Sequence, residues 1–401
     1  MSYHNVMKKR ILLSALAVFS IAAQSLAENW MKRLPDSSLP SELSIPGAHD
    51  AATGSGWGEG WDDMGDAFAR TQELSLGQLW AAGIRAFDLR PCVYEDYMNV
   101  NHGMVATAVH FESALRLLCD SLRANPSEFV VVHLLHESDG DQVEGTYNQR
   151  IQQLLGQEEW QDFLIDFRTD LTVGDLRGKM LIFSRDKYAT YPVTGGFFEN
   201  WTGDINWSKQ LAVRITGQKG VTARACVQDY SDTHGQGGVE KKVQAIVRML
   251  DATTKYKTTS ASTVRWAFNF ASAYSLVQSI FGFEVSTSDG YRDNATHTHA
   301  AIIGYLKEKP AGPTGVILMD FAGVDQSGDY QVRGQELVDA IIANNFRYIE
   351  ENTTAVTPPA ADRRQTAASQ RQTFLSDGRR SPSSNGRRLC VQKGRKIVTR
   401  Q

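Results

Sequence analysis

Apolar runs and amphipathic stretches alternate along residues 28–352, and this alternation predicts alternating strands and helices. Short runs rich in β-branched and aromatic residues are typical of buried strands. They cover Ile84–Leu89, Phe129–Leu135, Lys179–Ser184, Arg265–Ala271 and Gly315–Phe321. Apolar positions at helical spacing cover roughly Ser75–Ala82, His110–Ala124, Gly145–Leu154, Gly238–Thr253 and Gly334–Asn345. Strands that alternate with helices predict an α/β fold with a mostly parallel sheet.

Polar residues gather where the predicted strands end: Asp88, Arg90, Glu137, Arg185, Asp229 and Asp320. In a barrel of parallel strands the active site is built at these ends. An open doubly wound sheet would also place its site there, but its usual Gly-rich phosphate turn is missing. The glycine-rich segment 54–60 matches neither G-x-G-x-x-G nor the P-loop. The sequence therefore favours a TIM-like barrel formed by one domain over residues 28–352.

The amino-terminal end has the pattern of a secretory signal peptide over residues 1–27. Lys8-Lys9-Arg10 is followed by the apolar run Ile11–Ala23 and by Ser25-Leu26-Ala27, after which we expect cleavage. A retained membrane anchor is the alternative, but the apolar run is short for a bilayer. We therefore expect the mature protein to be secreted, or to lie at the cell surface or in the periplasm.

The carboxyl-terminal end also departs from the body. Residues 353–371 are rich in Pro, Ala, Thr and Gln, which is typical of a linker. Residues 372–401 are basic and contain two short β-like runs, Thr373–Arg380 and Leu389–Val398. This tail resembles the short sorting tails of secreted bacterial proteins, and a basic tail without that role is the alternative.

Charge and cysteine content narrow the classes of partner and cofactor. Residues 355–401 hold 11 Lys and Arg against 2 Asp, and residues 1–27 hold three basic residues and no acidic one, so the body carries a formal charge of −15. An acidic body argues against nucleic acid as the partner. The four cysteines, Cys92, Cys119, Cys226 and Cys390, have no C-x-x-C spacing, so neither a zinc knuckle nor a dense disulfide framework is indicated, and their redox state stays open.

The stretch from residue 43 to residue 103 concentrates acid–base chemistry. Ser44–Asp50 is an apolar run that ends in a His-Asp pair, and Asp88-Leu89-Arg90 and Asn101-His102-Gly103 follow. Alternate residues of a strand share one face, so Asp88 and Arg90 should point the same way. Two histidines can remove and supply protons, and a guanidinium can bind a phosphate. The sequence therefore predicts acid–base cleavage of a phosphate ester.

Other histidines offer alternatives that the spacing does not favour. His297-x-His299 and His133-x-x-His136-Glu137 could hold a metal, but neither is an H-E-x-x-H arrangement. His133 and His136 lie on or beside an apolar strand, and we interpret them as structural. We therefore predict no metal site.

Five segments follow one another in a specific order and spacing: Ser44–Asp50, Thr71-Gln72, Gly83–Arg90, His102-Gly103 and Asn125–Glu128. Together they resemble the catalytic X region of bacterial phosphatidylinositol-specific phospholipase C. The resemblance implies a distorted, incomplete TIM-like barrel in a bacterial protein. It also implies cleavage of phosphatidylinositol in membranes to diacylglycerol and inositol 1,2-cyclic phosphate, with glycosylated inositol anchors as a second candidate substrate. No cofactor is implied, and calcium is not expected, because Arg90 stands where the calcium-dependent branch carries a carboxylate.

The resemblance also implies roles for individual residues. His49 corresponds to the general base and Asp320 to the residue that orients it, while His102 corresponds to the general acid with Asp50 as its partner. Arg90 would bind the phosphate, with Asp88 in the same network. Contacts with the headgroup are implied for four further residues, Arg185, Asp229, Glu137 and Tyr230.

Two positions depart from the family pattern. Leu135 replaces a lysine, and Tyr230 directly follows Asp229, so that Ser231 occupies the place of the ring that stacks on inositol. We expect a monomer that contacts the bilayer through Trp57 and Trp61, with packing on the barrel as the alternative for both rings. The rival functions are a metal-dependent glycerophosphodiesterase and a non-catalytic inositol-lipid-binding protein on the same scaffold.

Overall fold

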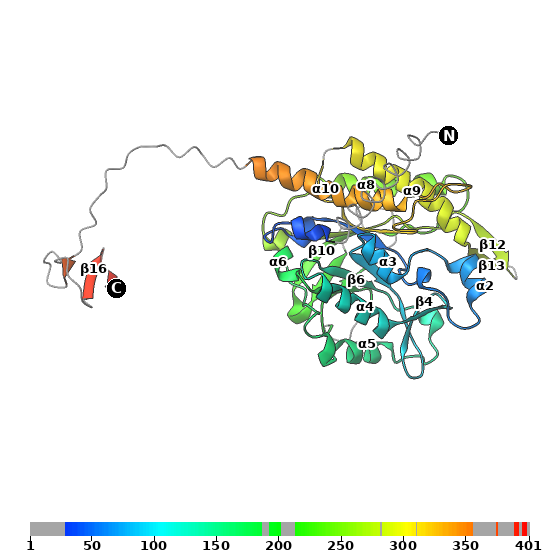
Figure 1. Cartoon of the computed structure of the whole chain (residues 1–401), viewed down its shortest axis with the longest axis horizontal. Coiled ribbons are helices and arrows are strands. Elements are labelled where there is room, and N and C mark those ends of the chain that lie inside the picture. The colour runs from blue at the N-terminus through cyan, green and yellow to red at the C-terminus, as the bar shows by residue number, and fades with distance from the viewer. Residues whose placement is uncertain are drawn as a thin grey trace, which may run out of the picture. The chain divides into compact units, whose positions relative to one another are not determined.

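The computed structural model describes residues 29–186, 192–201, 213–280, 283–309 and 311–355, together with three short strands near the carboxyl terminus (Figure 1). The chain divides into two compact units, Met1–Asn352 and Thr353–Gln401. The predicted signal peptide lies outside the described residues, as does most of the predicted linker. In the second unit, β15 (Phe374–Leu375), β16 (Leu389–Gln392) and β17 (Arg395–Val398) form an antiparallel sheet, so the second β-like run is a hairpin.

The first unit is built on a closed barrel of nine strands in the order β1, β14, β11, β10, β9, β8, β7, β6, β2. Strand β9 is antiparallel to both its neighbours, and the other pairs are parallel. The barrel strands are β1 (Ser44–Ala48), β2 (Ala86–Leu89), β6 (Val130–Leu134), β7 (Met180–Ser184), β8 (Gly196–Glu199), β9 (Arg214–Gly217), β10 (Thr222–Gln228), β11 (Arg265–Phe270) and β14 (Gly315–Met319).

Two smaller sheets and the helices surround the barrel. The sheets are formed by β3 (Pro91–Val93), β4 (Met98–His102) and β5 (Val105–His110), and by β12 (Val277–Ile280) and β13 (Phe283–Ser286). Figure 1 shows α8, α9 and α10 along one side of the barrel and α4 and α5 along the opposite side. The α-helices of the described residues are α2 (Asp62–Met64), α3 (Leu76–Ala81), α4 (Phe111–Ala124), α5 (Tyr147–Leu155), α6 (Val173–Leu176), α8 (Gly238–Thr253), α9 (Ser288–Glu308) and α10 (Gly334–Ala355). A π turn, η4 (Gly65–Ala69), follows α2.

Side chains fill the barrel, so it is a packed core and not a pore. Phe183 and Trp266 pack edge to face with ring centroids 4.9 Å apart, and Phe198 and Phe268 do so at 5.0 Å. Burial of each such ring contributes about 1.5–3 kcal/mol. The outer helices add apolar stripes at helical spacing, as in α4, whose buried residues are Phe111, Ala114, Leu115, Leu118, Cys119 and Leu122.

The prediction of a distorted TIM-like α/β barrel is confirmed, and each predicted strand and helix matches an observed element to within a few residues at its start. The structure differs in several respects, and it contains strands that were not predicted, among them β8 and β9 of the barrel. The ring of strands is closed rather than incomplete, because the antiparallel β9 fills the space between β8 and β10. Helix α10 continues ten residues beyond the predicted end at Asn345. Helix α9 was not predicted, because buried polar residues such as Asn294, Thr298 and His299 interrupt its apolar face.

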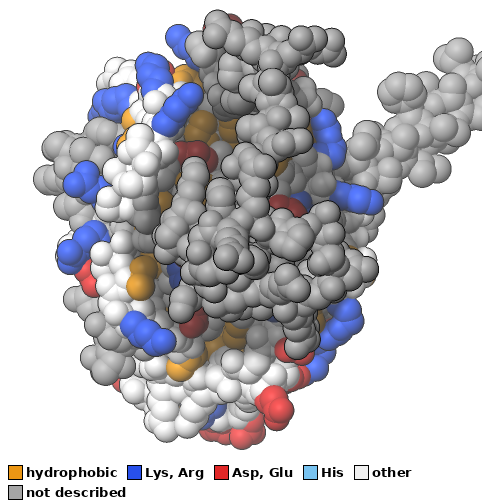
Figure 2. Space-filling model, turned by 90° about the vertical axis from the view of Figure 1, so that its left-hand side faces the viewer, with side chains coloured by type: hydrophobic (Ala, Val, Ile, Leu, Met, Phe, Trp, Pro, Cys, Tyr) orange, Lys and Arg blue, Asp and Glu red, His pale blue; other side chains and the backbone are white. Residues whose placement is uncertain are grey.

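The described surface, thiols and helices have the following features. On the face seen in Figure 2, the described Lys and Arg side chains lie scattered among polar and acidic ones rather than in one basic patch. Cys92, Cys119 and Cys226 are buried free thiols in the described part of the chain. No helix within the described ranges has the length and apolar character needed to cross a bilayer.

Candidate active site

The predicted base and its orienting carboxylate are placed side by side by strand register. Strand β1 pairs in parallel with β14, with Ala48 opposite Met319, so the next residues, His49 and Asp320, are neighbours at the carboxyl edge of the barrel. His49 Nδ1 lies 2.7 Å from Asp320 Oδ1. Since an ionised carboxylate only accepts hydrogen bonds, Nδ1 carries the proton and Nε2 is the basic atom.

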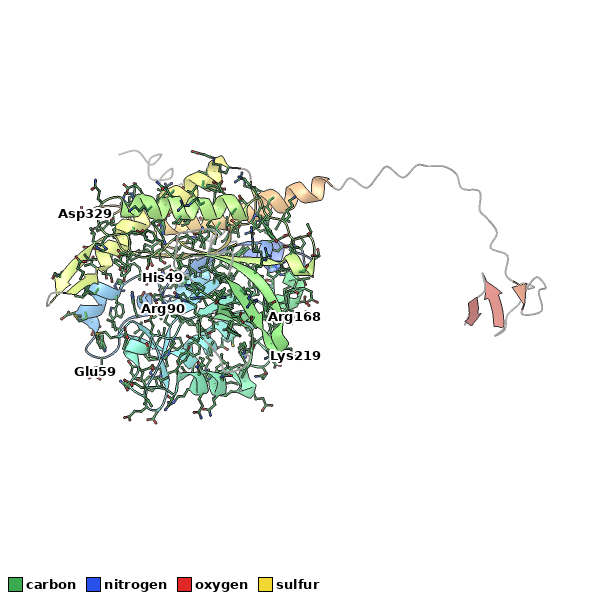
Figure 3. All side chains as sticks on the ribbon, turned by 180° about the vertical axis from the view of Figure 1, so that it is seen from behind. His49, Glu59, Arg90, Arg168, Lys219 and Asp329 are labelled. Carbon is green, nitrogen blue, oxygen red and sulfur yellow. The ribbon has the colours of Figure 1, made fainter. Side chains whose placement is uncertain are left out.

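Burial lowers the pKa of His49, but the charges of Asp50 and Asp320 outweigh this effect and raise the pKa above its ordinary value of 6.5. The Nε2 atom of His49 accepts a hydrogen bond from Arg90 Nη2 at 2.8 Å. Figure 3 shows His49 and Arg90 in the interior, far from the peripheral Glu59, Arg168, Lys219 and Asp329. The imidazole is thus held with its basic nitrogen beside a fixed cation.

The two residues that follow this pair have strained backbone conformations. Asp50 has φ +42° and Phe321 has φ +48°, values that favour glycine and cost about 1–3 kcal/mol each. Thr71 holds both: its carbonyl accepts from the Phe321 N–H at 2.7 Å, and its hydroxyl donates to the Asp50 carbonyl at 3.3 Å. The turns that present the two side chains are therefore imposed by the surrounding structure.

Gln72 joins the ends of β1 and β14 directly. Its amide nitrogen donates to the carbonyls of His49 at 2.7 Å and Met319 at 2.9 Å, and its oxygen accepts from Ala322 N at 3.0 Å. The sequence motif contained Thr71-Gln72, but its spacing carried no sign of this bridging role. Gln72 is a positioning residue that only the fold reveals.

Arg90 is held by three carboxylates at the carboxyl end of β2. Its Nη1 donates to Glu137 Oε1 at 2.8 Å, and its Nε and Nη2 donate to Asp88 Oδ2 at 3.2 and 3.1 Å. Asp50 Oδ1 is also 2.8 Å from Nε, but without hydrogen-bond geometry. Although burial opposes the charge, these carboxylates keep the pKa of Arg90 well above its ordinary value. The guanidinium is therefore a permanent, immobile cation.

Asp88 connects the arginine to the interior of the barrel. Its Oδ1 is 2.6 Å from His133 Nδ1, and its Oδ2 accepts from the Asp50 N–H at 3.2 Å as well as from Arg90. Burial opposes its ionisation, but Arg90 and His133 hold the pKa of Asp88 well below the usual range. His133 is structural, as we predicted, and it also fixes the carboxylate that orients Arg90.

The predicted acid, His102, reaches the same cavity from β4, outside the barrel. Its Nδ1 donates to the Ala69 carbonyl at 2.9 Å. The predicted partner, Asp50, is 3.7 Å from Nδ1, near enough for a charge interaction but too far for a hydrogen bond. Neither Asp50 oxygen has a hydrogen-bond donor among the described residues. The fold thus fixes His102 through a backbone carbonyl that no side-chain motif could reveal.

The cavity into which these groups point has a volume of about 270 Å³, near the lower end of the ~300–1,000 Å³ range of small-molecule sites. One side is formed by Arg185 and Asp229, joined at 3.4 Å, with the Trp201 indole N–H donating to Asp229 Oδ2 at 3.1 Å. The described lining residues are His49, Asp50, Arg90, His102, Leu135, Arg185, Asp229, Ser231, Ser272, Ala273, Tyr274 and Tyr291.

Tyr230 is not among these lining residues, in contrast to the prediction. Its N–H donates to Gln228 Oε1 at 2.9 Å, and its carbonyl accepts from Lys242 Nζ at 2.6 Å, so its backbone is tied down beneath the cavity. Ser231 lines the cavity instead, and aromatic surface comes from Tyr274 and Tyr291. Glu137 meets the site through Arg90 rather than as a lining residue.

Of the two tryptophans proposed for bilayer contact, Trp57 is buried. It is only 8% exposed, donates to Asp66 Oδ1 at 2.7 Å, and packs tightly over Gly65, where a Cβ atom would lie 2.2 Å from the indole. Trp61 is half-buried and packs on the same small cluster. Trp57 therefore packs on the protein, which was the alternative to bilayer contact for both tryptophan rings.

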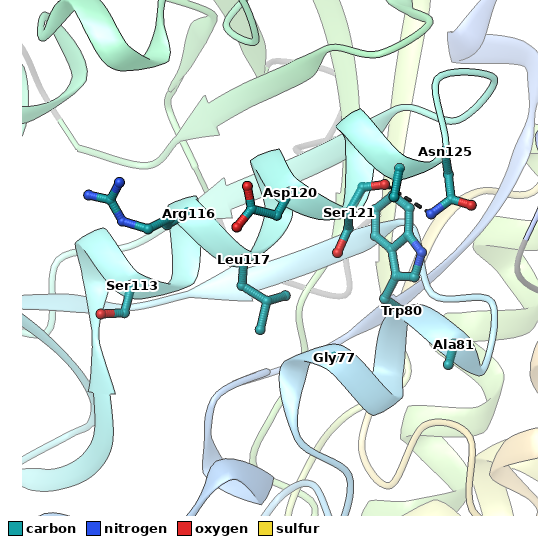
Figure 4. A pocket seen from close by; sticks show the side chains of 10 residues that line it. Gly77, Trp80, Ala81, Ser113, Arg116, Leu117, Asp120, Ser121 and Asn125 are labelled. Carbon is teal, nitrogen blue, oxygen red and sulfur yellow. Dashed lines mark hydrogen bonds between the residues drawn. The ribbon is translucent and has the colours of Figure 1, made fainter.

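A larger, more open groove of about 610 Å³ lies between α3 and α4 (Figure 4). Among its lining residues are Trp80, Arg116 and Asp120, but no histidine. It lacks the paired proton-transfer groups of the smaller cavity, so volume does not identify the reactive site.

His49, Asp50 and Asp88 offer three atoms within 4.8 Å of one another that could hold a metal ion. The Arg90 guanidinium lies against the same atoms, 2.8 Å from Asp50 Oδ1 and 3.1 Å from Asp88 Oδ2. A cation bound there would meet a fixed positive charge at contact distance. The donor set therefore fits a guanidinium better than a metal ion.

Comparisons with known proteins follow this geometry. No family model matches the sequence. The chain is 27% identical over 320 residues to a 1-phosphatidylinositol phosphodiesterase of Staphylococcus aureus, covering 78% of this chain and 94% of that protein. It is 31% identical over 168 residues to the protein of the same name from Listeria monocytogenes, covering 40% of this chain and 49% of that protein.

Solved structures give the same result for the fold. A phosphatidylinositol-specific phospholipase C from Staphylococcus aureus superposes with a TM-score of 0.60 at 22% identity, covering 79% of this chain and 98% of that one. The enzyme from Listeria monocytogenes gives a TM-score of 0.57 at 23% identity, with coverage of 80% and 98%. The chain thus shares its barrel fold with bacterial phosphatidylinositol-specific phospholipases C, and over most of its length its sequence is similar to that of a 1-phosphatidylinositol phosphodiesterase.

Proposed function

We propose that this protein is a secreted phospholipase C that cleaves phosphatidylinositol, with glycosylated inositol anchors as a second substrate. The observation that carries the proposal is the convergence in one cavity of His49, with Nε2 as its basic atom, the immobile Arg90 and the independently held His102. The names of the sequence relatives support the choice of phosphatidylinositol.

In the proposed reaction, His49 Nε2 takes the proton of the inositol 2-hydroxyl, whose oxygen attacks phosphorus. The bond from phosphorus to the diacylglycerol oxygen breaks, and His102 gives that oxygen a proton from Nε2. Inositol 1,2-cyclic phosphate and diacylglycerol result. Holding nucleophile and phosphorus in one molecule supplies the advantage of proximity.

Arg90 supplies the charge that the reaction needs. As the phosphate enters, a phosphate oxygen replaces His49 Nε2 as the acceptor of the Arg90 Nη2 hydrogen, which frees Nε2 for the hydroxyl proton. A preorganised guanidinium stabilises the negative charge of the transition state without reorganisation. Arg185 and Asp229 offer a donor and an acceptor for headgroup hydroxyls, and Leu135 lines the same cavity.

We also propose that the protein contacts the bilayer through the surface formed by α2, the β4–β5 turn and the residue before β12. This surface carries three exposed apolar side chains, Met64, Met104 and Leu276. η4 contacts both β5 and β13, so these elements adjoin. The membrane binding of a staphylococcal structural neighbour supports a peripheral mode of contact.

The test is incubation of the mature chain with phosphatidylinositol vesicles, with and without EDTA, followed by phosphorus NMR. We expect the cyclic phosphate as first product at equal rates in both samples. The His49→Ala and His102→Ala variants should fold and lose nearly all turnover. Loss of activity in EDTA would indicate a metal-dependent phosphodiesterase, and vesicle binding without any product would indicate a lipid-binding protein.

A further inference from the structure

Tyr291 lines the cavity, but neither the predicted roles nor the proposed reaction uses it. It lies in the first turn of α9, and its hydroxyl is 3.3 Å from His102 Nε2 and 2.7 Å from Ser286 Oγ. Its ring is 4% exposed and packs with Ala295, Phe321 and Val332. The position of the hydroxyl is therefore fixed by the packing of the ring.

The tautomer of His102 decides how this contact works. Because Nδ1 donates to the Ala69 carbonyl, the proton on Nε2 is the one that His102 can exchange. Unprotonated Nε2 can only accept, and the nearest hydroxyl is that of Tyr291. Burial raises the pKa of Tyr291 well above its ordinary value, so the phenol keeps its proton and can donate it in a hydrogen bond.

We propose that Tyr291 is a positioning residue for the acid step: its hydroxyl holds His102 Nε2 at the cavity wall and bonds to the nitrogen after the proton has left. Ser286 completes the arrangement, because its hydroxyl can donate to the Tyr291 oxygen and turn the phenolic hydrogen toward Nε2. Only the proton of the proposed reaction moves, from Nε2 to the leaving oxygen. The proposal rests on the proposed function, in which His102 is the acid.

The charged groups around this contact do not substitute for Tyr291. Asp50 lies 3.7 Å from Nδ1, on the other nitrogen, and Asp320 and Arg90 act on Tyr291 only through their charges. On α9 and β13, Tyr291 and Ser286 are the described groups that connect to Nε2 by hydrogen bonds. The second partner of His102 therefore comes from a helix far along the chain.

The test compares two substrates for the Tyr291→Phe variant: phosphatidylinositol, whose alkoxide leaving group needs a proton, and an aryl ester of inositol 1-phosphate, whose phenolate leaves unaided. We expect kcat on the lipid to fall roughly fivefold to tenfold, the factor for one neutral hydrogen bond. The rate on the aryl ester should fall less than twofold. His102→Ala should show the same selectivity with a larger loss.

Tyr305→Phe is the matched control, because it removes the hydroxyl of another tyrosine of α9 whose partners, Asp251 and Thr254, are remote from the cavity. It should change neither rate. Equal losses on both substrates, or no loss on either, would overturn the role of Tyr291.

A substrate-free measurement separates this proposal from the proposed function. The ¹⁵N resonance of His102 Nε2 should move in Tyr291→Phe and stay in place in Tyr305→Phe. If the unaltered chain turns over neither substrate, the proposed function fails while the resonance still reports the contact. A resonance that is the same in all three chains would overturn the contact itself.

Discussion

Replacing Asp320 by Asn isolates the interaction that makes His49 a base. The substitution keeps the shape of the side chain, which is fully buried, and removes the charge that accepts from His49 Nδ1 at 2.7 Å. A charge-assisted hydrogen bond of this kind is worth about 1.5–3 kcal/mol. At about 1.4 kcal/mol for each factor of ten, the loss of kcat should be roughly 10- to 150-fold.

Two further effects give the prediction its signature. If the new amide nitrogen faces Nδ1, the imidazole must place its proton on Nε2, which is the wrong tautomer for a base, and the loss will exceed this range. Removal of the Asp320 charge also takes away one of the two charges that raise the pKa of His49. The base must be neutral, so activity falls as the pH falls through that pKa, and the acid limb should move to lower pH in the variant.

The assay is the pH dependence of cyclic phosphate release from phosphatidylinositol vesicles, followed by phosphorus NMR. Asp329→Asn, an exposed carboxylate on the loop after β14, is the matched control and should leave both rate and limb unchanged. The reasoning would be refuted by a folded Asp320→Asn protein with a rate within threefold of the parent, or with an acid limb that has not moved.

Three other predictions address the support of the site. Gln72→Ala should lower the free energy of unfolding by about 2–4 kcal/mol in urea titrations, because it removes two hydrogen bonds to buried carbonyls at two strand ends and the side-chain acceptor of the Ala322 N–H; a change below 0.5 kcal/mol would show that water replaces the amide. Arg85→Met should lower the free energy of unfolding by about 3–5 kcal/mol, because the Glu128 carboxylate stays buried without its ion pair. The double variant with Glu128→Gln should recover part of this loss. If the effects of the two substitutions on the free energy of unfolding merely add, the result would argue against the pair. Arg90→Lys should lose at least tenfold in kcat without gaining metal dependence, because an ammonium cannot match the forked geometry of a guanidinium; stimulation of the variant by calcium would contradict our reading of the carboxylates.

The groups that share one stretch of sequence could be assigned from it. His49, Asp88, Arg90 and His102 follow apolar runs or lie within them, and pairing of β1 with β2 and of β2 with β6 is enough to bring the first three together. The strand-end position of Asp320 was equally readable, because β14 is a continuous apolar run bounded by glycine and a charge. The spacing of apolar residues indicates where helices and strands begin and end, because each element buries one or both of its faces.

Other parts of the site depended on contacts that no periodicity encodes. The partner of His102 Nδ1 is a backbone carbonyl in η4, and the partner of its Nε2 is Tyr291, 189 residues away in a helix without a clean apolar face. Among the buried polar residues of α9, Asn294 donates to the Ala271 carbonyl directly after β11 at 3.0 Å. Ser231 rather than Tyr230 lines the cavity, and the backbone of Tyr230 is bonded to Gln228 and Lys242, which no side-chain pattern indicated.

The sequence by itself determined the barrel class, five of its strands with several of the helices between them, and the residues suited to move protons beside a phosphate, because these follow from local periodicity and side-chain chemistry. Tertiary structure alone decided the closure of the ring through β9, the hydrogen bonds that fix each tautomer, the burial of Trp57, and the entry of Tyr291 into the site. Those features depend on where distant segments of the chain come into contact. These contacts are determined by the free energy of packing of the whole chain, not of any single segment.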